Sequence, residues 1–146
     1  MTRTSPGSPN RMPARTKARK RALDILFECE VRGLPLGATL DERVLAGDPP
    51  VRPLTAELVR GVVARQAEIE ELIVSSLVAG WTMDRMPRVD RCLARMAVWE
   101  LLDGATSAEV ALQQAVQLAQ ELSTDGSAAF LNGLLARVRE RLDGQR

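Results

Sequence analysis

Histidine and tyrosine are absent from the 146-residue sequence, and the only aromatic residues are two Trp and two Phe. Without histidine, a serine or cysteine nucleophile has no imidazole base, and histidine-ligated metal sites are excluded. No glycine-rich phosphate-binding motif occurs either. The two cysteines, Cys29 and Cys92, form no CxxC pair and lie within apolar helical patterns, so we expect two buried free thiols. These absences predict a protein that is not an enzyme and that holds no metal or cofactor.

Long apolar segments are also missing. No run reaches the roughly 18 apolar residues that a membrane-spanning helix needs. The basic N-terminus is not followed by the apolar stretch of a secretory signal. We therefore expect a cytoplasmic protein with no membrane segment.

The apolar residues recur at intervals of three and four, which is the period of an amphipathic helix. The scarcity of aromatics and the abundance of Ala, Leu and Arg also favour helices over strands. Six helices are predicted, over residues 14–32, 36–46, 55–79, 87–102, 110–122 and 127–142, with a short helical turn between residues 82 and 86. Thr55 and Ser127 are the expected N-caps, and Gly33 is the expected stop of the first helix. The pattern indicates an all-α bundle of about seven helices in one compact domain, residues 14–146.

The net charge of +1 conceals an uneven distribution of charge. Residues 1–21 contain seven Lys or Arg and no acid, whereas the rest of the chain contains 13 basic and 19 acidic residues. Residues 1–13 also include three prolines, and we expect them to form a disordered basic leader. A basic arm on an acidic body indicates a polyanion as the partner.

The first predicted helix concentrates this positive charge in its first two turns. Like charges at helical spacing destabilise a helix by about 0.2–0.5 kcal/mol per pair, and cations at its N-terminus oppose the helix dipole. A bound phosphate backbone would relieve both costs, and Arg can donate two hydrogen bonds to one phosphate. Nucleic-acid binding is therefore favoured over a solvated arm that only neutralises acidic residues. Four aromatic rings are too few for an extended base-stacking platform.

Five segments occur in an order and at separations that resemble a known family. They are residues 14–27 (ARTKARKRALDILF), 60–62 (RGV), 87–101 (PRVDRCLARMAVWEL), 110–119 (VALQQAVQLA) and 127–135 (SAAFLNGLL). Each alone is weak, but together they resemble the NusB family of transcription antitermination factors over residues 14–142. The resemblance implies an all-helical fold of two packed bundles.

The resemblance also implies a non-catalytic RNA-binding protein that recognises the single-stranded boxA element of ribosomal RNA leaders. Its implied partners are NusE, a ribosomal small-subunit protein, and RNA polymerase in an antitermination complex. Some relatives are dimers, so the choice between monomer and homodimer stays open. The alternative interpretation is a helical protein–protein adaptor whose basic arm only keeps it soluble.

The family's binding positions carry over to individual residues of this sequence. The candidates for RNA contact are Arg15, Lys17, Arg19, Lys20, Arg21 and Phe130. The candidates for partner contact are Phe27, Asp90 and Phe130. Because Arg15, Lys17 and Arg19 are expected to lie off the apolar stripe, their joint replacement by Glu is expected to remove RNA binding and leave stability nearly unchanged.

The last two helices depart from the family's pattern at Gln113, Gln114, Gln120, Gly126 and Ala129. Charged residues usual at several of these positions are missing, so it stays open whether RNA binding requires the partner. Phe130 has two interpretations. Helical spacing would place it in the core, where its loss costs about 3–5 kcal/mol, whereas the resemblance implies a partly exposed ring beside a helix N-terminus that can accept a phosphate.

Overall fold

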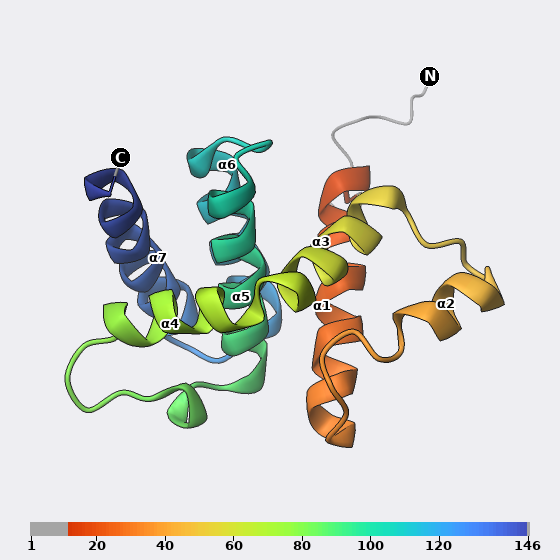
Figure 1. Cartoon of the computed structure of the whole chain (residues 1–146), viewed down its shortest axis with the longest axis horizontal. Coiled ribbons are helices and arrows are strands. Elements are labelled where there is room, and N and C mark those ends of the chain that lie inside the picture. The colour runs from red at the N-terminus through yellow and green to blue at the C-terminus, as the bar shows by residue number, and fades with distance from the viewer. Residues whose placement is uncertain (1–11, 146) are drawn as a thin grey trace.

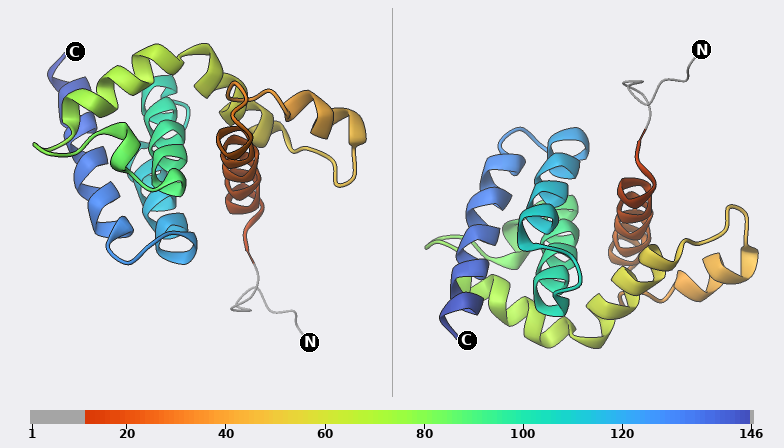
Figure 2. Two further views of the ribbon diagram at one scale, coloured as in Figure 1. Left: turned by 90° about the horizontal axis from the view of Figure 1, so that it is seen from below. Right: turned by 90° about the horizontal axis from the view of Figure 1, so that it is seen from above.

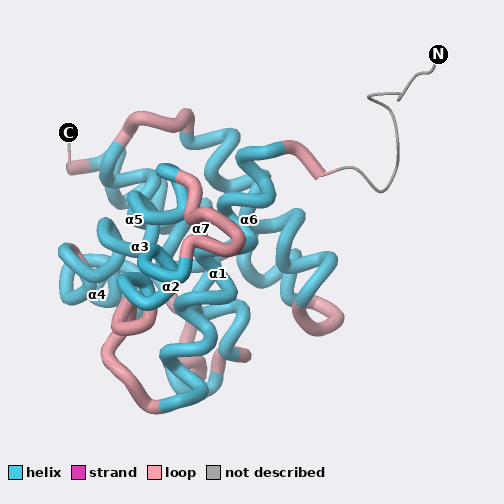
Figure 3. The backbone as a smooth tube through the Cα atoms, turned by 90° about the vertical axis from the view of Figure 1, so that its right-hand side faces the viewer, coloured by secondary structure: helices cyan, strands magenta, loops and turns pink. Residues whose placement is uncertain are grey.

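A computed structural model describes residues 12–145, and within this range the chain forms seven α-helices, one 3-10 turn and no strand (Figure 1, Figure 3). The elements are α1 (Ala14–Arg32), α2 (Leu40–Ala46), α3 (Pro53–Ala64), α4 (Gln66–Ser76), η1 (Met83–Arg85), α5 (Arg88–Asp103), α6 (Ala108–Leu122) and α7 (Ser127–Gly144). The predicted all-α bundle is confirmed. Residues 1–11 of the predicted basic leader lie outside the described residues. None of the described helices has the length and apolar character needed to cross a membrane.

The helices form two groups, as the resemblance implied. Figures 1 and 2 show α1–α3 on one side of the molecule and α4–α7 on the other. Helix α5 joins the groups, because it packs against α1 and α3 as well as against α4, α6 and α7. One continuous apolar cluster runs through both groups, with Leu26 and Leu58 from the first and Leu93 and Leu134 from the second. The two sub-bundles therefore share a single core.

Helix α1 begins and ends where the sequence predicts. Pro13 precedes it, and Gly33 ends it in the left-handed region at φ 69°. The alternation of apolar and polar residues buries Ala18, Ala22 and Cys29 against the core. Because α1 contacts both α3 and α5 along this face, its basic residues divide between the packed face and the surface.

The long helix predicted over residues 55–79 is interrupted. At Arg65 the backbone leaves the helical region (φ −121°, ψ 25°), which separates α3 from α4. The predicted N-cap Thr55 is also wrong. The helix begins at Pro53, where a missing N–H has no cost. The buried Thr55 hydroxyl instead donates a hydrogen bond to the carbonyl of Ala18, at 2.8 Å, and so ties α3 to α1.

The second predicted helix is shorter than expected and projects from the body. It begins at Leu40 rather than at residue 36, and Figure 1 shows it at the edge of the molecule away from α4–α7. Leu40 is buried, but Val44 and Leu45, expected on the same apolar stripe, are exposed. Only the first turn of α2 therefore packs its apolar side chain against the core.

Helices α3 and α5 approach each other closely at one glycine. An added Cβ at Gly61 would overlap the indole ring of Trp99. The Arg-Gly-Val segment of the sequence is thereby explained, because only glycine leaves room for the ring. Cys29 and Cys92 are buried and free, which confirms that prediction.

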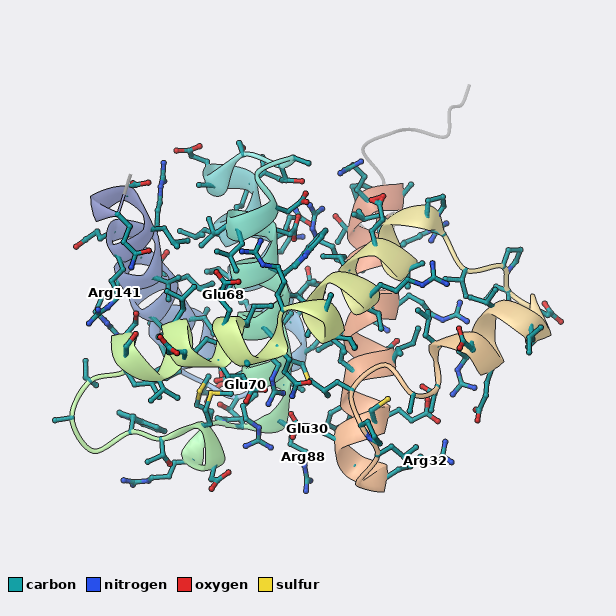
Figure 4. All side chains as sticks on the ribbon, viewed as in Figure 1. Glu30, Arg32, Glu68, Glu70, Arg88 and Arg141 are labelled. Carbon is teal, nitrogen blue, oxygen red and sulfur yellow. The ribbon has the colours of Figure 1, made fainter. Side chains whose placement is uncertain are left out.

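A network of ion pairs fixes α1 relative to the second sub-bundle, and Figure 4 labels its two carboxylates, Glu30 and Glu70. Glu30 of α1 accepts hydrogen bonds from Arg91 and from Arg95, the latter at 2.6 Å, and Arg95 also reaches Glu70 of α4 at 3.0 Å. Burial opposes ionisation of Glu30, but the two guanidinium groups hold its pKa below the ordinary value. Burial and the charge of Glu30 raise the pKa of Cys92 to about 12, so this thiol stays protonated.

Candidate nucleic-acid interface

The five basic residues of α1 have three different environments. Arg15 and Lys17 are exposed, Lys20 and Arg21 are half-buried, and Arg19 is only 3% exposed. Lys20 forms an exposed ion pair with Asp24 at 3.4 Å. Arg15, Lys17 and Arg21 form no ion pair with any of residues 12–145. Exposed cations without protein partners are available to an external anion.

Arg19 is a structural residue, and the expectation that it lies off the buried face is wrong. Its Nε and Nη2 donate to the two carboxylate oxygens of Glu100 on α5, at 3.1 and 2.8 Å. Both side chains are almost fully buried. The planar guanidinium satisfies both oxygens at once, which is what a buried charge pair requires. Arg19 is therefore removed from the set of residues that can contact RNA.

Three of the four remaining candidate cations of α1, together with Asp24, form one wall of a groove. Lys17, Lys20, Arg21 and Asp24 follow helical spacing, so they share a face that borders the segment before α3. The opposite wall contains Pro49, Pro50, Arg52 and Thr55, and the groove has a volume of about 400 Å³. Sequence reasoning did not single out Arg52. Its signal is weak, since it is one basic residue in a proline-rich loop.

A hydrogen bond places the first turn of α1 beside α6. The hydroxyl of Thr16 donates to Oε1 of Gln114 at 2.9 Å. Gln114 is one of the positions where the sequence departs from the family's pattern. In this chain its amide has a packing role, and the exposed Arg15 and Lys17 flank this contact along α1.

Asp90 does not lie on the surface, which corrects its assignment as a partner-contacting residue. It is 2% exposed, and its Oδ1 accepts a hydrogen bond from the Ser123 hydroxyl. The hydroxyl of Ser127 donates to that of Ser123 at 3.1 Å. Asp90 thus begins a buried chain of hydrogen bonds that holds the turn between α6 and α7.

Ser127 is not the N-cap that the sequence predicted. The residue before α7 is Gly126, which adopts φ 86°, a conformation that glycine reaches without strain. Ser127 is the first helical residue, and its buried hydroxyl is used in the Asp90 chain. Gly126 therefore has a conformational role at a position where the family often has an acid.

Phe130 of α7 forms a surface aromatic cluster with Trp81, which precedes η1. Its ring centroid is 5.1 Å from that of Trp81, and the guanidinium of Arg85 lies 5.4 Å from the Trp81 centroid. Phe130 is half-buried, and Trp81 is exposed. The partial exposure expected from the resemblance is confirmed, although the ring also packs against the core. Phe27, the other aromatic candidate, is 36% exposed on α1.

Within residues 12–145, no group of three or more Cys, Asp or Glu side chains is placed to hold a metal ion. The surface described above presents the cations of α1, the Trp81–Phe130 aromatic pair and the exposed ring of Phe27. Cations and aromatic rings are the groups that contact phosphates and bases. The arrangement is suited to binding a polyanion.

Comparison with known proteins gives a consistent result. Residues 16–140 match the model of the NusB family. The transcription antitermination protein NusB of Kineococcus radiotolerans is 50% identical over 130 residues, which cover 88% of this chain and 95% of that protein. The same protein of Salinispora tropica is 52% identical over 134 residues, covering 88% of this chain and 97% of that protein.

Solved structures share the fold. NusB of T. maritima has a TM-score of 0.72 at 26% identity, covering 89% of this chain and 93% of that chain. A crystal structure of antitermination factors NusB and NusE in complex with dsRNA has a TM-score of 0.74 at 24% identity, covering 87% of this chain and 96% of that chain.

Proposed function

This chain belongs to the NusB family of transcription antitermination proteins, and on that premise we propose that it is a non-catalytic RNA-binding factor. It recognises the single-stranded boxA element of ribosomal RNA leaders together with NusE, and it helps RNA polymerase to pass terminators. It acts in the cytoplasm. The observation that carries the proposal is the family match over residues 16–140, together with about half-identical relatives over nearly their whole length.

The described surface supports this proposal. Arg15, Lys17, Lys20 and Arg21 present positive charge along α1, and each is at least partly accessible. Phe130 is accessible at the edge of α7. We assign these residues to RNA, and Phe27 and Phe130 to the surface shared with NusE. A neighbouring structure that holds NusB, NusE and dsRNA is consistent with a joint surface of this kind.

The salt dependence of RNA binding tests the proposal. If four cations contact phosphates, the logarithm of the affinity should fall with the logarithm of salt concentration with a slope of about −2.8, at roughly −0.7 per contact. Fluorescence anisotropy with a labelled boxA RNA, at several salt concentrations and with or without NusE, measures this slope. No binding at low salt, or binding independent of salt, would contradict the proposal. Binding of NusE without any RNA binding would instead support the adaptor interpretation.

Replacing Phe130 by Asp is expected to reduce binding to NusE, to RNA or to both, and to leave the protein folded. The ring is half-buried, so its loss costs less than that of a fully buried Phe, although its tilted contact with Trp81 is lost as well. Circular dichroism checks the fold, and anisotropy and calorimetry check the two ligands. An unfolded variant would place Phe130 in the core, and a folded variant with unchanged binding to both ligands would remove it from the site.

A further inference from the structure

The groove between α1 and the loop before α3 is electropositive on both walls. Lys17 and Arg21 lie on the α1 wall and Arg52 on the loop wall. None of the three forms an ion pair or hydrogen bond through its side chain with the described residues. Among those residues, Asp24 is the one acid in the lining, and it is already paired with Lys20. The groove therefore has an excess of positive charge, because Asp24 offsets only one of the four cations in its lining.

The helix that begins at this groove adds to the positive potential. Arg52 immediately precedes α3, and the first turn of α3 contains no acidic residue. The first turn of α1 contains none either. Figure 1 shows the start of α3 beside the first turns of α1. Unpaired N–H groups at a helix N-terminus carry partial positive charge, and a cation placed there is unfavourable unless an anion neutralises it.

We infer that this groove binds the phosphate backbone of single-stranded RNA, with Arg52 as a contact opposite Lys17 and Arg21. The inference rests on the proposed function and adds the loop before α3 to the RNA-binding surface of α1. The lining contains cations, prolines and a threonine but, among the described residues, no aromatic ring on which a base could stack. It also lacks an apolar anchor pocket of the kind that dominates protein–protein contacts. The groove thus binds backbone and does not read sequence.

Asp24 limits the affinity of the groove. Its carboxylate repels phosphate directly, and it also engages Lys20 at 3.4 Å. Both side chains of this pair are substantially exposed, so the pair contributes little to stability. Neutralising Asp24 should therefore strengthen RNA binding, whereas neutralising Arg52 should weaken it. These opposite signs are specific to an anion in the groove.

The test compares Arg52→Gln and Asp24→Asn with Arg141→Gln in the full chain. Arg141 is an exposed arginine near the end of α7, on the far side of the molecule from α1 (Figure 4). Each protein is titrated with boxA RNA and with a shuffled RNA of the same length and composition. Arg52→Gln is expected to lower the affinity for both RNAs equally, by about two- to fivefold, which corresponds to the loss of one exposed ion pair. Its salt slope should become less negative by about 0.7. Asp24→Asn should raise the affinity for both RNAs, and Arg141→Gln should change neither affinity.

Each contrary result has a distinct meaning. Equal behaviour of Arg52→Gln and Arg141→Gln would overturn the groove assignment and leave the proposed function intact. A loss confined to boxA RNA would overturn backbone-only binding. Weaker RNA binding by Asp24→Asn would overturn the assignment of the groove to an anion. Displacement of RNA by polyglutamate from the wild type but not from Arg52→Gln would indicate an acidic protein segment as the occupant. Failure of the wild type to bind either RNA would contradict the proposed function itself. Melting temperatures of Arg52→Gln and Asp24→Asn should equal that of the wild type, because neither Arg52 nor Asp24 is buried.

Discussion

Replacing Glu100 by alanine is expected to lower the free energy of unfolding by about 3–5 kcal/mol, the usual cost of leaving a buried charge without its partner. Glu100 and Arg19 are almost fully buried and are joined by two hydrogen bonds. Removing the carboxylate leaves the Arg19 guanidinium with neither water nor an acceptor. Urea denaturation followed by circular dichroism measures the change.

Two control variants separate the ion pair from the simple loss of a side chain. The double variant Arg19→Met/Glu100→Leu removes both charges, and it should be far more stable than Glu100→Ala. Glu71→Ala removes an exposed carboxylate and should change stability by no more than about 0.5 kcal/mol. A cost below 1 kcal/mol for Glu100→Ala would show that the pair is not closed in solution. The double variant should also bind RNA like the wild type, since Arg19 is buried beneath the basic surface.

Reversing the charge of Arg15, Lys17 and Arg21 to Glu is expected to reduce RNA affinity by about 100-fold or more, because three phosphate contacts are replaced by repulsion. The melting temperature should change little. These side chains form no ion pair with the described residues, and acids near a helix N-terminus interact favourably with its dipole. Anisotropy and thermal melting measure the two quantities on the same samples.

The control for this variant makes the same change of net charge elsewhere. Reversing Arg88, Arg139 and Arg141 to Glu lowers the total charge equally, but away from the basic surface of α1. Because these residues contact Glu30, Glu109 and the Ser75 carbonyl, the RNA titration of this control is read only where circular dichroism shows that it is folded. If RNA binding depended only on total charge, both triple variants would lose it to the same extent. If RNA binding depends on the α1 surface, only the variant of Arg15, Lys17 and Arg21 will lose it. A large loss of stability in the first variant would instead place Arg15, Lys17 or Arg21 in structural contacts.

The local features of the chain are predictable from the sequence because they depend on neighbouring residues. Helical periodicity and the glycine at position 33 define α1 over Ala14–Arg32, and the cluster of cations in its first turns is read directly. The buried thiols follow from apolar spacing in the same way. The family resemblance rests on five such local segments, and the family match covers residues 16–140.

Periodicity cannot show which face of a helix meets another helix, or how far a stripe remains covered. Val44 and Leu45 match an apolar stripe, yet no element packs over them. The break at Arg65 depends on α3 packing against α1 and α5 while α4 turns toward α7. The hydroxyl of Thr55 bonds to Ala18, and that contact exists only once α1 and α3 are in place.

The sequence by itself determined the helical class, the extent of α1, the concentration of basic residues and the family. The tertiary structure alone decided which of those basic residues are free. Arg19 and Glu100 are 81 positions apart, and Ser123 and Asp90 are 33 apart. The identity of such partners is not encoded in local spacing, because it follows from the packing of whole helices. A charged residue is therefore structural or functional according to the partner that the fold brings to it.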